Sequence, residues 1–188
     1  MLRAEILAAT HELLERTGSA DDVSIRAIAQ RVGVTTPSVY LHFSDKRQLM
    51  QAVVTQSFAE LDRTVRNETR RATTPADRLL ACGQAYVAFA LRRPEHYRVA
   101  LMSHTGAACA DRAPVRTVLQ FLKPLVDDYA ADQPSPESTS ASLTLELWAT
   151  AHGAASLLIV TPQLQWGDIP AFVERTLCAA LHGFHAVQ

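Results

Sequence analysis

The chain has 188 residues, of which 48% are hydrophobic, so it can bury the core of one or two domains without disulfide bridges. Its 18 basic and 19 acidic side chains give a formal net charge of -1, which excludes a polycation that coats nucleic acid or anionic lipid. The three cysteines are widely spaced, which argues against a disulfide framework or a cysteine metal site and favours a cytoplasmic protein. Glu5, His11 and Glu12 interrupt the apolar N-terminal stretch, so no signal peptide is expected.

Apolar residues recur at spacings of three and four along the chain, which predicts an all-α protein. The first helix is expected at Leu2–Thr17, and Gly18 suits the left-handed position that ends a helix. Ser24 is a good N-cap for a second helix, which Gly33 ends. A third, very short helix is expected from Thr35, which can cap it, to about residue 43.

A long fourth helix, at about residues 44–67, is expected to connect an N-terminal domain of residues 1–47 to a second domain of residues 72–188. The polar stretch that Pro75 closes marks the boundary between them. Further helices are expected at about residues 75–92, 95–102, 114–131, 136–160 and 171–185, which makes about nine in all.

One stretch, residues 143–160, is apolar and almost long enough to cross a membrane. It contains Glu146 and His152, and ionisable groups near the centre of a bilayer are costly. A buried helix of a soluble protein is therefore the better interpretation, and no membrane partner is expected.

The residues between Ser24 and Phe43 predict two short helices joined by a glycine turn, the geometry of a helix-turn-helix. The outward positions of its second helix carry hydrogen-bonding side chains and no acid, as a groove lined by phosphates requires. These positions are Thr35, Thr36, Ser38, Tyr40 and His42, with Arg26, Arg31, Lys46 and Arg47 flanking them.

The run IRAIAQRVGVTTPSVYLHFSDKRQL resembles the N-terminal motif of the TetR family of bacterial transcriptional regulators. The resemblance implies a three-helix DNA-binding domain, a homodimer on a palindromic double-stranded operator, and release by a small molecule. Carried over to this chain, it implies that the DNA contacts come from Ser24, Arg26, Thr35, Thr36, Ser38, Tyr40, His42 and Lys46.

A softer resemblance lies in LWATAHGAAS, which is similar to the WHG-type C-terminal domain of some members of that family. It implies a ligand-binding and dimerisation domain with a largely apolar effector. Aromatic and apolar residues at helical spacing more often belong to the hydrophobic core than to a ligand site. The family resemblance nevertheless implies a ligand pocket, which would be lined by Tyr86, Phe89, Tyr97, Met102, Phe121, Leu122, Trp148 and His152. His152 fits both a ligand contact and a buried histidine that locks neighbouring helices.

The helix expected at residues 136–160 has two adjacent apolar stripes, which implies that it is buried on two faces. Small residues allow helices to approach closely, so one stripe is expected at a two-fold dimer interface together with the last helix. Those residues are Leu147, Ala151, Ala154, Leu158, Val173, Leu177 and Phe184. Packing of the same stripe within one chain is the alternative.

Two other classes of function are alternatives to a DNA-binding regulator. An enzyme would need a nucleophile, a base and an orienting acid at a recognisable spacing, and none occurs among the seven histidines and their neighbours. His182 and His185 have no cluster of acids or cysteines beside them, so neither a metal nor a cofactor is expected. A helical adaptor that does not act through DNA remains the second alternative.

Overall fold

In a computed structural model, residues 1–102, 113–132 and 140–186 are described, and throughout them the chain forms helices and turns with no strand. This agrees with the all-α expectation. The chain folds into two compact units. The N-terminal unit contains residues 1–59 and 93–115, and the C-terminal unit contains residues 60–92 and 116–188.

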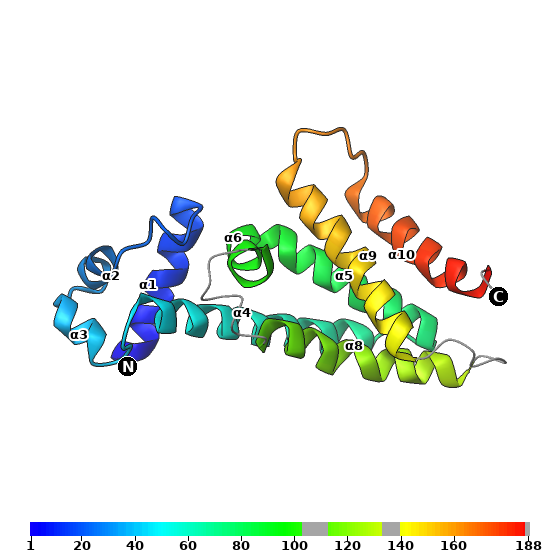
Figure 1. The fold of residues 1–188 in the computed structure, drawn as a ribbon, viewed down its shortest axis with the longest axis horizontal. Helices are drawn as coiled ribbons and strands as arrows, with labels where there is room; N and C mark the ends of the chain where they lie inside the picture. Colours follow the sequence, from blue (N-terminus) through cyan, green and yellow to red (C-terminus); the bar gives the residue numbers. More distant parts are fainter. Residues whose placement is uncertain (103–112, 133–139, 187–188) are drawn as a thin grey trace. The chain divides into compact units, whose positions relative to one another are not determined.

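The N-terminal unit is built from short helices. They are α1 (Leu2–Thr17), α2 (Ile25–Val32), α3 (Thr36–Tyr40), the first part of α4 (Lys46–Thr69), α6 (Pro94–Tyr97) and the π-helical segment η1 (Arg98–Met102). Helix α2 packs against α1 and α3, and α6 contacts α1. The blue and cyan segments of Figure 1 are these first helices.

The end of α1 and both ends of α2 form where the sequence predicts them, whereas α3 ends at Tyr40, before the expected end at about residue 43. Gly18 and Gly33 adopt φ values of 73° and 79°, which side chains with a Cβ rarely adopt, and each ends its helix in the left-handed conformation. The Ser24 hydroxyl accepts a hydrogen bond of 3.1 Å from the amide of Ala27 and caps α2. Asp45 caps α4 in the same way, since its Oδ1 accepts from the Gln48 amide at 2.7 Å.

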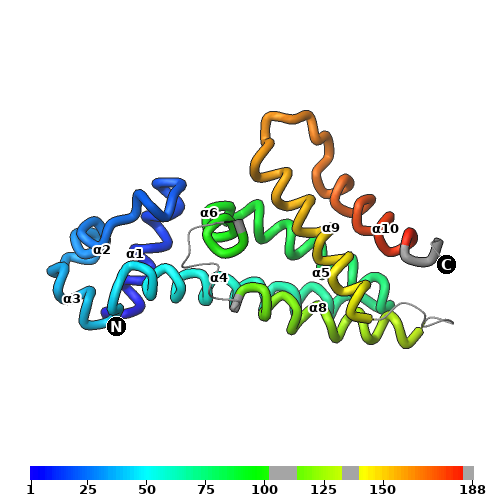
Figure 2. The backbone as a smooth tube through the Cα atoms, in the orientation of Figure 1, coloured from blue at the N-terminus to red at the C-terminus, as the bar shows by residue number. Residues whose placement is uncertain are grey.

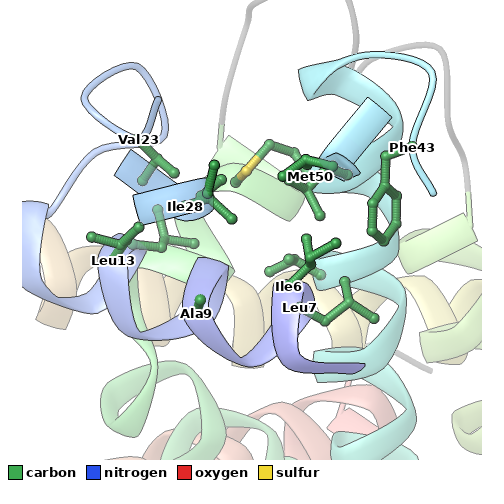
Figure 3. Packing of buried hydrophobic residues seen from close by; sticks show 13 residues of the cluster. Ile6, Leu7, Ala9, Leu13, Val23, Ile28, Phe43 and Met50 are labelled. Atoms are coloured by element: carbon green, nitrogen blue, oxygen red, sulfur yellow. The ribbon is translucent and has the colours of Figure 1, made fainter. Parts of the chain in front are cut away.

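A single apolar cluster holds the N-terminal unit together (Figure 3). Ile6 and Leu14 of α1 and Ile28 of α2 are fully buried in it, and Phe43 follows α3 with 2% of its surface exposed. Val99 of η1 packs against the same cluster, so a segment distant in sequence contributes to this core. Burial of large apolar side chains is the main force that fixes α3 in place.

The C-terminal unit is built from long helices. They are the end of α4, then α5 (Pro75–Arg92), most of α8 (Ala113–Ala131), α9 (Ser140–Val160) and α10 (Ile169–Ala186). Helices α5, α9 and α10 all contact one another, and the tube in Figure 2 shows how α9 leads into α10. Gly83 of α5 lets α10 approach closely, since a Cβ added there would lie 2.7 Å from Leu177 Cδ1.

The structure differs from the sequence-based expectation at the sixth helix and in how the chain divides into units. The sixth helix, expected at residues 95–102, is a single α-helical turn followed by the π-helical η1. The segment between the helices expected at residues 95–102 and 114–131 lies almost wholly outside the described residues. The compact units are also not contiguous in sequence, because residues 93–115 return to the N-terminal unit instead of following the expected boundary at residue 72.

Helix α9 is the one described helix that is long and apolar enough, by length and composition, to cross a membrane. Eight of its residues are buried in the structure, and it packs against α5 and α10. Such packing is typical of the core helix of a globular domain, as the sequence analysis expects.

Candidate nucleic-acid interface and ligand pocket

Helices α2 and α3 form the two-helix unit that the sequence predicts. Ile28, Ala29 and Val39 are buried at 3% exposure or less and hold the inner faces of α2 and α3. The opposite side of α3 faces solvent, where Tyr40 is 50% exposed and Leu41 is 85% exposed. The short helix therefore presents its outer side chains to whatever binds this surface.

The predicted DNA contacts of α3 lie on this outer surface. Thr35, Tyr40 and His42 are exposed, and Thr36 and Ser38 are half-buried. The expectation that the Thr35 hydroxyl caps the helix is wrong, because no backbone amide donates to it. Instead Thr35 Oγ1 lies 2.9 Å from Ser38 Oγ, so these two hydroxyls order each other beside the surface.

Positively charged side chains flank this surface. Arg26 is exposed on α2, and Lys46 Nζ donates to the carbonyl oxygen of Asp21 at 3.1 Å, which fixes the lysine at the start of α4. Arg31 pairs with Glu12 at 2.8 Å and is turned toward α1. The surface thus combines hydroxyl, phenol, imidazole and cationic groups, a set that suits phosphate oxygens and base edges.

Leu41 is a further residue of this surface, which the sequence pattern did not predict. Its side chain stands between those of Tyr40 and His42 in the chain and is more exposed than any other large apolar side chain described apart from Met1. An apolar residue in a polar run is the signal that could have identified it. An exposed aliphatic group on such a surface can contact a thymine methyl group in a major groove.

A pair of histidines joins α1 to α6 within the N-terminal unit. His96 is fully buried, and its Nε2 lies 2.6 Å from His11 Nδ1, with the two rings stacked at 4.8 Å between centroids. His11 Nε2 lies 3.3 Å from Gln56 Oε1, so α4 also contacts this pair. Arg93 donates to Glu15 at 2.7 Å and forms a second link between these elements.

Acid should destabilise the protein through His96. Burial first, and then the neighbouring His11 and Arg93, lowers the pKa of His96 to about 3. The unfolded chain binds this proton with an ordinary pKa of 6.5, so stability is lost as the pH falls from 6.5 toward 3. We expect this group to cost about 2 kcal/mol between pH 7 and pH 5.

Urea unfolding of the wild type and of His96→Gln at pH 7 and pH 5 measures this cost. The glutamine keeps a neutral hydrogen-bonding group but does not titrate, so the difference in stability between the two proteins should shift by that amount. An equal pH dependence in both proteins would contradict the assignment.

The C-terminal unit contains a pocket between α5, α8, α9 and α10. Its walls are Leu79, Leu80, Cys82, Gly83, Tyr86, Val118, Phe121, Leu122, Leu147, Trp148, Ala151, Leu177 and Leu181. The cavity volume is about 20 Å³, which is enough for one water molecule. In this conformation the pocket is therefore nearly closed by its own side chains.

A small polar network lies in this apolar wall. Trp148 Nε1 donates to Tyr86 Oη at 3.2 Å, and Tyr86 Oη lies 3.3 Å from His152 Nδ1. Burial lowers the pKa of His152, so its ring is neutral at pH 7 and Nδ1 can accept a hydrogen bond from the Tyr86 hydroxyl. The network joins α5 to α9, and its members are all uncharged.

Four of the residues expected at a ligand site line the pocket, namely Tyr86, Phe121, Leu122 and Trp148. His152 does not line the pocket but contacts the Tyr86 hydroxyl, and Phe89 is buried in α5 away from the pocket walls. Tyr97 and Met102 belong to the N-terminal unit, and the Met102 side chain lies outside the described part of the structure. Gly83 was the missed signal, since a glycine inside a helix indicates a close approach.

The stripe expected at a dimer interface faces the interior of the chain instead. Its members in α9 and α10 are no more than 6% exposed in the single chain, so they have no surface left for a second copy; these are Leu147, Ala151, Ala154, Leu158, Val173 and Leu177. Three of them line the pocket or cover Gly83. The alternative of packing within one chain describes this stripe, and the Phe184 side chain lies outside the described residues.

Comparison with known families gives two matches that together span most of the chain. Residues 6–53 match the model described as bacterial regulatory proteins, tetR family. Residues 79–177, more than half of the chain, match the model described as tetracyclin repressor-like, C-terminal domain. The first match contains the surface around α3, and the second contains most of the pocket.

Solved structures share this fold over nearly their whole length. A protein of unknown function from Rhodococcus sp. RHA1 is 23% identical, with a TM-score of 0.80 over 97% of this chain and 95% of that one. The transcriptional regulator FadR from Bacillus subtilis, solved in complex with stearoyl-CoA, is 13% identical, with a TM-score of 0.79 and coverage of 96% and 98%. A TetR/AcrR family regulator from Thermobifida fusca is 21% identical, with a TM-score of 0.68 and 97% coverage of both chains.

Proposed function

Because the chain belongs to the tetR family of bacterial regulatory proteins and is a ligand-responsive DNA-binding transcriptional regulator rather than an enzyme, we propose that it is a cytoplasmic homodimeric repressor. A small molecule in the C-terminal unit releases it from a palindromic operator. The observation that carries the proposal is the outward row of hydrogen-bonding side chains on α3, held by a fully buried Val39.

Helix α3 enters the major groove in this proposal. Thr36 and Ser38 reach base edges or the nearest phosphates, while Tyr40, His42 and Lys46 bind the backbone on either side. Ser24, Arg26 and Thr35 complete the contacts from α2 and the turn before α3. Two copies of α3 related by a two-fold axis read half-sites about 34–36 Å apart.

The effector acts through the helices that join the two units. Helix α4 contributes residues to both units, and α5 leads directly into α6, which is held to α1 by the His11–His96 and Glu15–Arg93 contacts. A ligand that expands the pocket shifts these helices and changes the separation of the two α3 helices in the dimer. A coupling free energy of about 1–3 kcal/mol is typical of such a mechanism.

The dimer forms through a face of α9 that is exposed in the described part of the structure. Leu145, Leu157 and Val160 are 56%, 53% and 57% exposed on one side of this helix. Between them lie Ala149 and Gly153, and a Cβ added at Gly153 would meet nothing within 4 Å. Small residues flanked by exposed apolar ones favour close packing against the same helix of a second copy.

Leu157→Glu should split this dimer. A charge at a symmetric interface meets its own copy and loses water without a partner, so we expect dimer affinity to fall at least about a hundredfold. Light scattering or sedimentation over a range of concentrations measures it. Ala8→Glu adds the same charge at an exposed position of α1 and should leave the dimer intact. Equal behaviour of the two variants would exclude this face of α9.

The regulatory function is tested on DNA. Fragments selected by the protein from a random pool, and from the region upstream of its own gene, should contain an inverted repeat. Binding should weaken steeply with salt, since phosphate contacts release counterions. Metabolite extracts of the producing cell should release the fragment. Recovery of no DNA at low salt would favour the adaptor alternative.

A further inference from the structure

The described walls of the pocket carry no charge. Their polar atoms are the Cys82 thiol, the Tyr86 hydroxyl and the Trp148 indole nitrogen. Burial raises the pKa of the Cys82 thiol to about 12, so it stays protonated at every physiological pH. His152, behind Tyr86, is kept neutral by the same desolvation. No described side chain of the lining could neutralise an anion.

The space for a ligand is defined by two residues on facing helices. The Leu177 side chain lies directly over Gly83, with its two methyl carbons 2.7 and 2.8 Å from where a glycine Cβ would stand. It therefore fills the hollow that the glycine leaves. A side chain that packs on a helix backbone can swing away by a change of rotamer, and the hollow it leaves joins the existing cavity.

We propose that the effector is an uncharged, largely hydrocarbon molecule with one hydroxyl or carbonyl group, which binds at the Tyr86–Trp148 pair and occupies the space that Leu177 now fills. This rests on the proposed function, in which the same pocket takes the effector. A buried ionised group with no partner is strongly disfavoured, whereas a hydrocarbon body gains from leaving water. The Trp148 proton is donated to Tyr86 and the Tyr86 proton to His152, so the polar group of the effector binds between Trp148 and Tyr86 and replaces their mutual hydrogen bond. It accepts from Nε1 and, where it is a hydroxyl, donates to Oη.

The intrinsic fluorescence of Trp148 tests this class directly. Trp166, whose Nε1 donates to the Thr161 carbonyl, does not line the pocket, so Trp166→Phe leaves one reporter in the wall. The probes are 1-octanol, octanoate and octanoyl-CoA at pH 8, which share one chain length and differ in charge. We expect saturable binding of octanol, and binding of the other two at least tenfold weaker.

Two variants of α10 locate the binding site. Leu177→Ala should tighten octanol binding several-fold, because it empties the hollow over Gly83. Val173→Ala removes fewer side-chain atoms one turn earlier in α10, at a buried residue that does not line the pocket. It should change octanol binding less than twofold. Tyr86→Phe removes one hydroxyl and should weaken octanol several-fold.

The outcomes separate this inference from the function it rests on. Octanoate or octanoyl-CoA binding as tightly as octanol, with the same response to Leu177→Ala, would overturn the uncharged class and keep the pocket as the effector site. No saturable change for any probe, in the parent or in Leu177→Ala, would overturn both the class and the pocket. Equal effects of Leu177→Ala and Val173→Ala on octanol affinity would show that octanol does not bind in the space beside Gly83.

Discussion

Replacing Tyr40 and His42 together by alanine should abolish measurable binding to the operator. Both side chains are exposed beside α3, and in a dimer the double change removes four contacts to phosphate. At about 1 kcal/mol for each such hydrogen bond, the loss is about 4 kcal/mol. This corresponds to roughly a thousandfold weaker binding. Fluorescence anisotropy on the selected operator measures it at several salt concentrations.

The control for this prediction is Arg16→Ala, which removes an exposed positive charge from the last turn of α1. It should change operator affinity less than threefold. Light scattering and circular dichroism should show that the double variant keeps its dimer and its helices. Retained binding in a folded double variant would mean that the outward surface of α3 is not the DNA contact.

Phe43→Ala should unfold the N-terminal unit under mild conditions. Phe43 is 2% exposed in the core of that unit, and the guanidinium carbon of Arg3 lies 5.0 Å from its ring centroid. Truncation of a buried phenylalanine leaves a cavity and costs about 3–5 kcal/mol. Amide exchange of the residues of α2 and α3 is the suitable measurement, because it reports on this unit separately from the C-terminal unit.

Leu41→Ala is the matched control, two positions earlier and 85% exposed. It removes a similar side chain that contributes little to the folded core, so we expect less than about 0.5 kcal/mol. Similar losses of protection in the two variants would show that Phe43 does not anchor α3. Leu41→Ala should still weaken binding to operators that place a thymine methyl group against this side chain.

The helix ends were predictable because they depend on local chemistry. Gly18, Ser24 and Gly33 act through their own backbone and nearest neighbours, so the sequence alone locates the turns. The π-helical η1 was not predictable, because no residue in it signals a change of hydrogen-bonding register. The return of residues 93–115 to the N-terminal unit depends on contacts distant in sequence, which a periodic pattern does not encode.

The same distinction applies to the functional residues. The proposed DNA-binding surface lies within residues 24–46, so its candidate residues could be predicted from one stretch of sequence and the family that it resembles. The apolar stripe of α9 shows that Leu147 and Ala151 are buried, but it does not say whether the partner is α5, α10 or a second copy. The pocket draws its walls from four helices, and its membership follows only from the folded chain.

Because residues 93–115 belong to the N-terminal unit, this unit cannot complete its core until the ribosome has also synthesised residues 60–92 of the C-terminal unit. A ribosome that has released residues 1–59 has not yet provided Val99, which packs on the core, or His96, which binds His11. At about 5–20 residues per second, several seconds separate these two points. A nascent or prematurely terminated chain therefore lacks part of this core, which limits how well an incomplete regulator could occupy the operator before its sensing half exists.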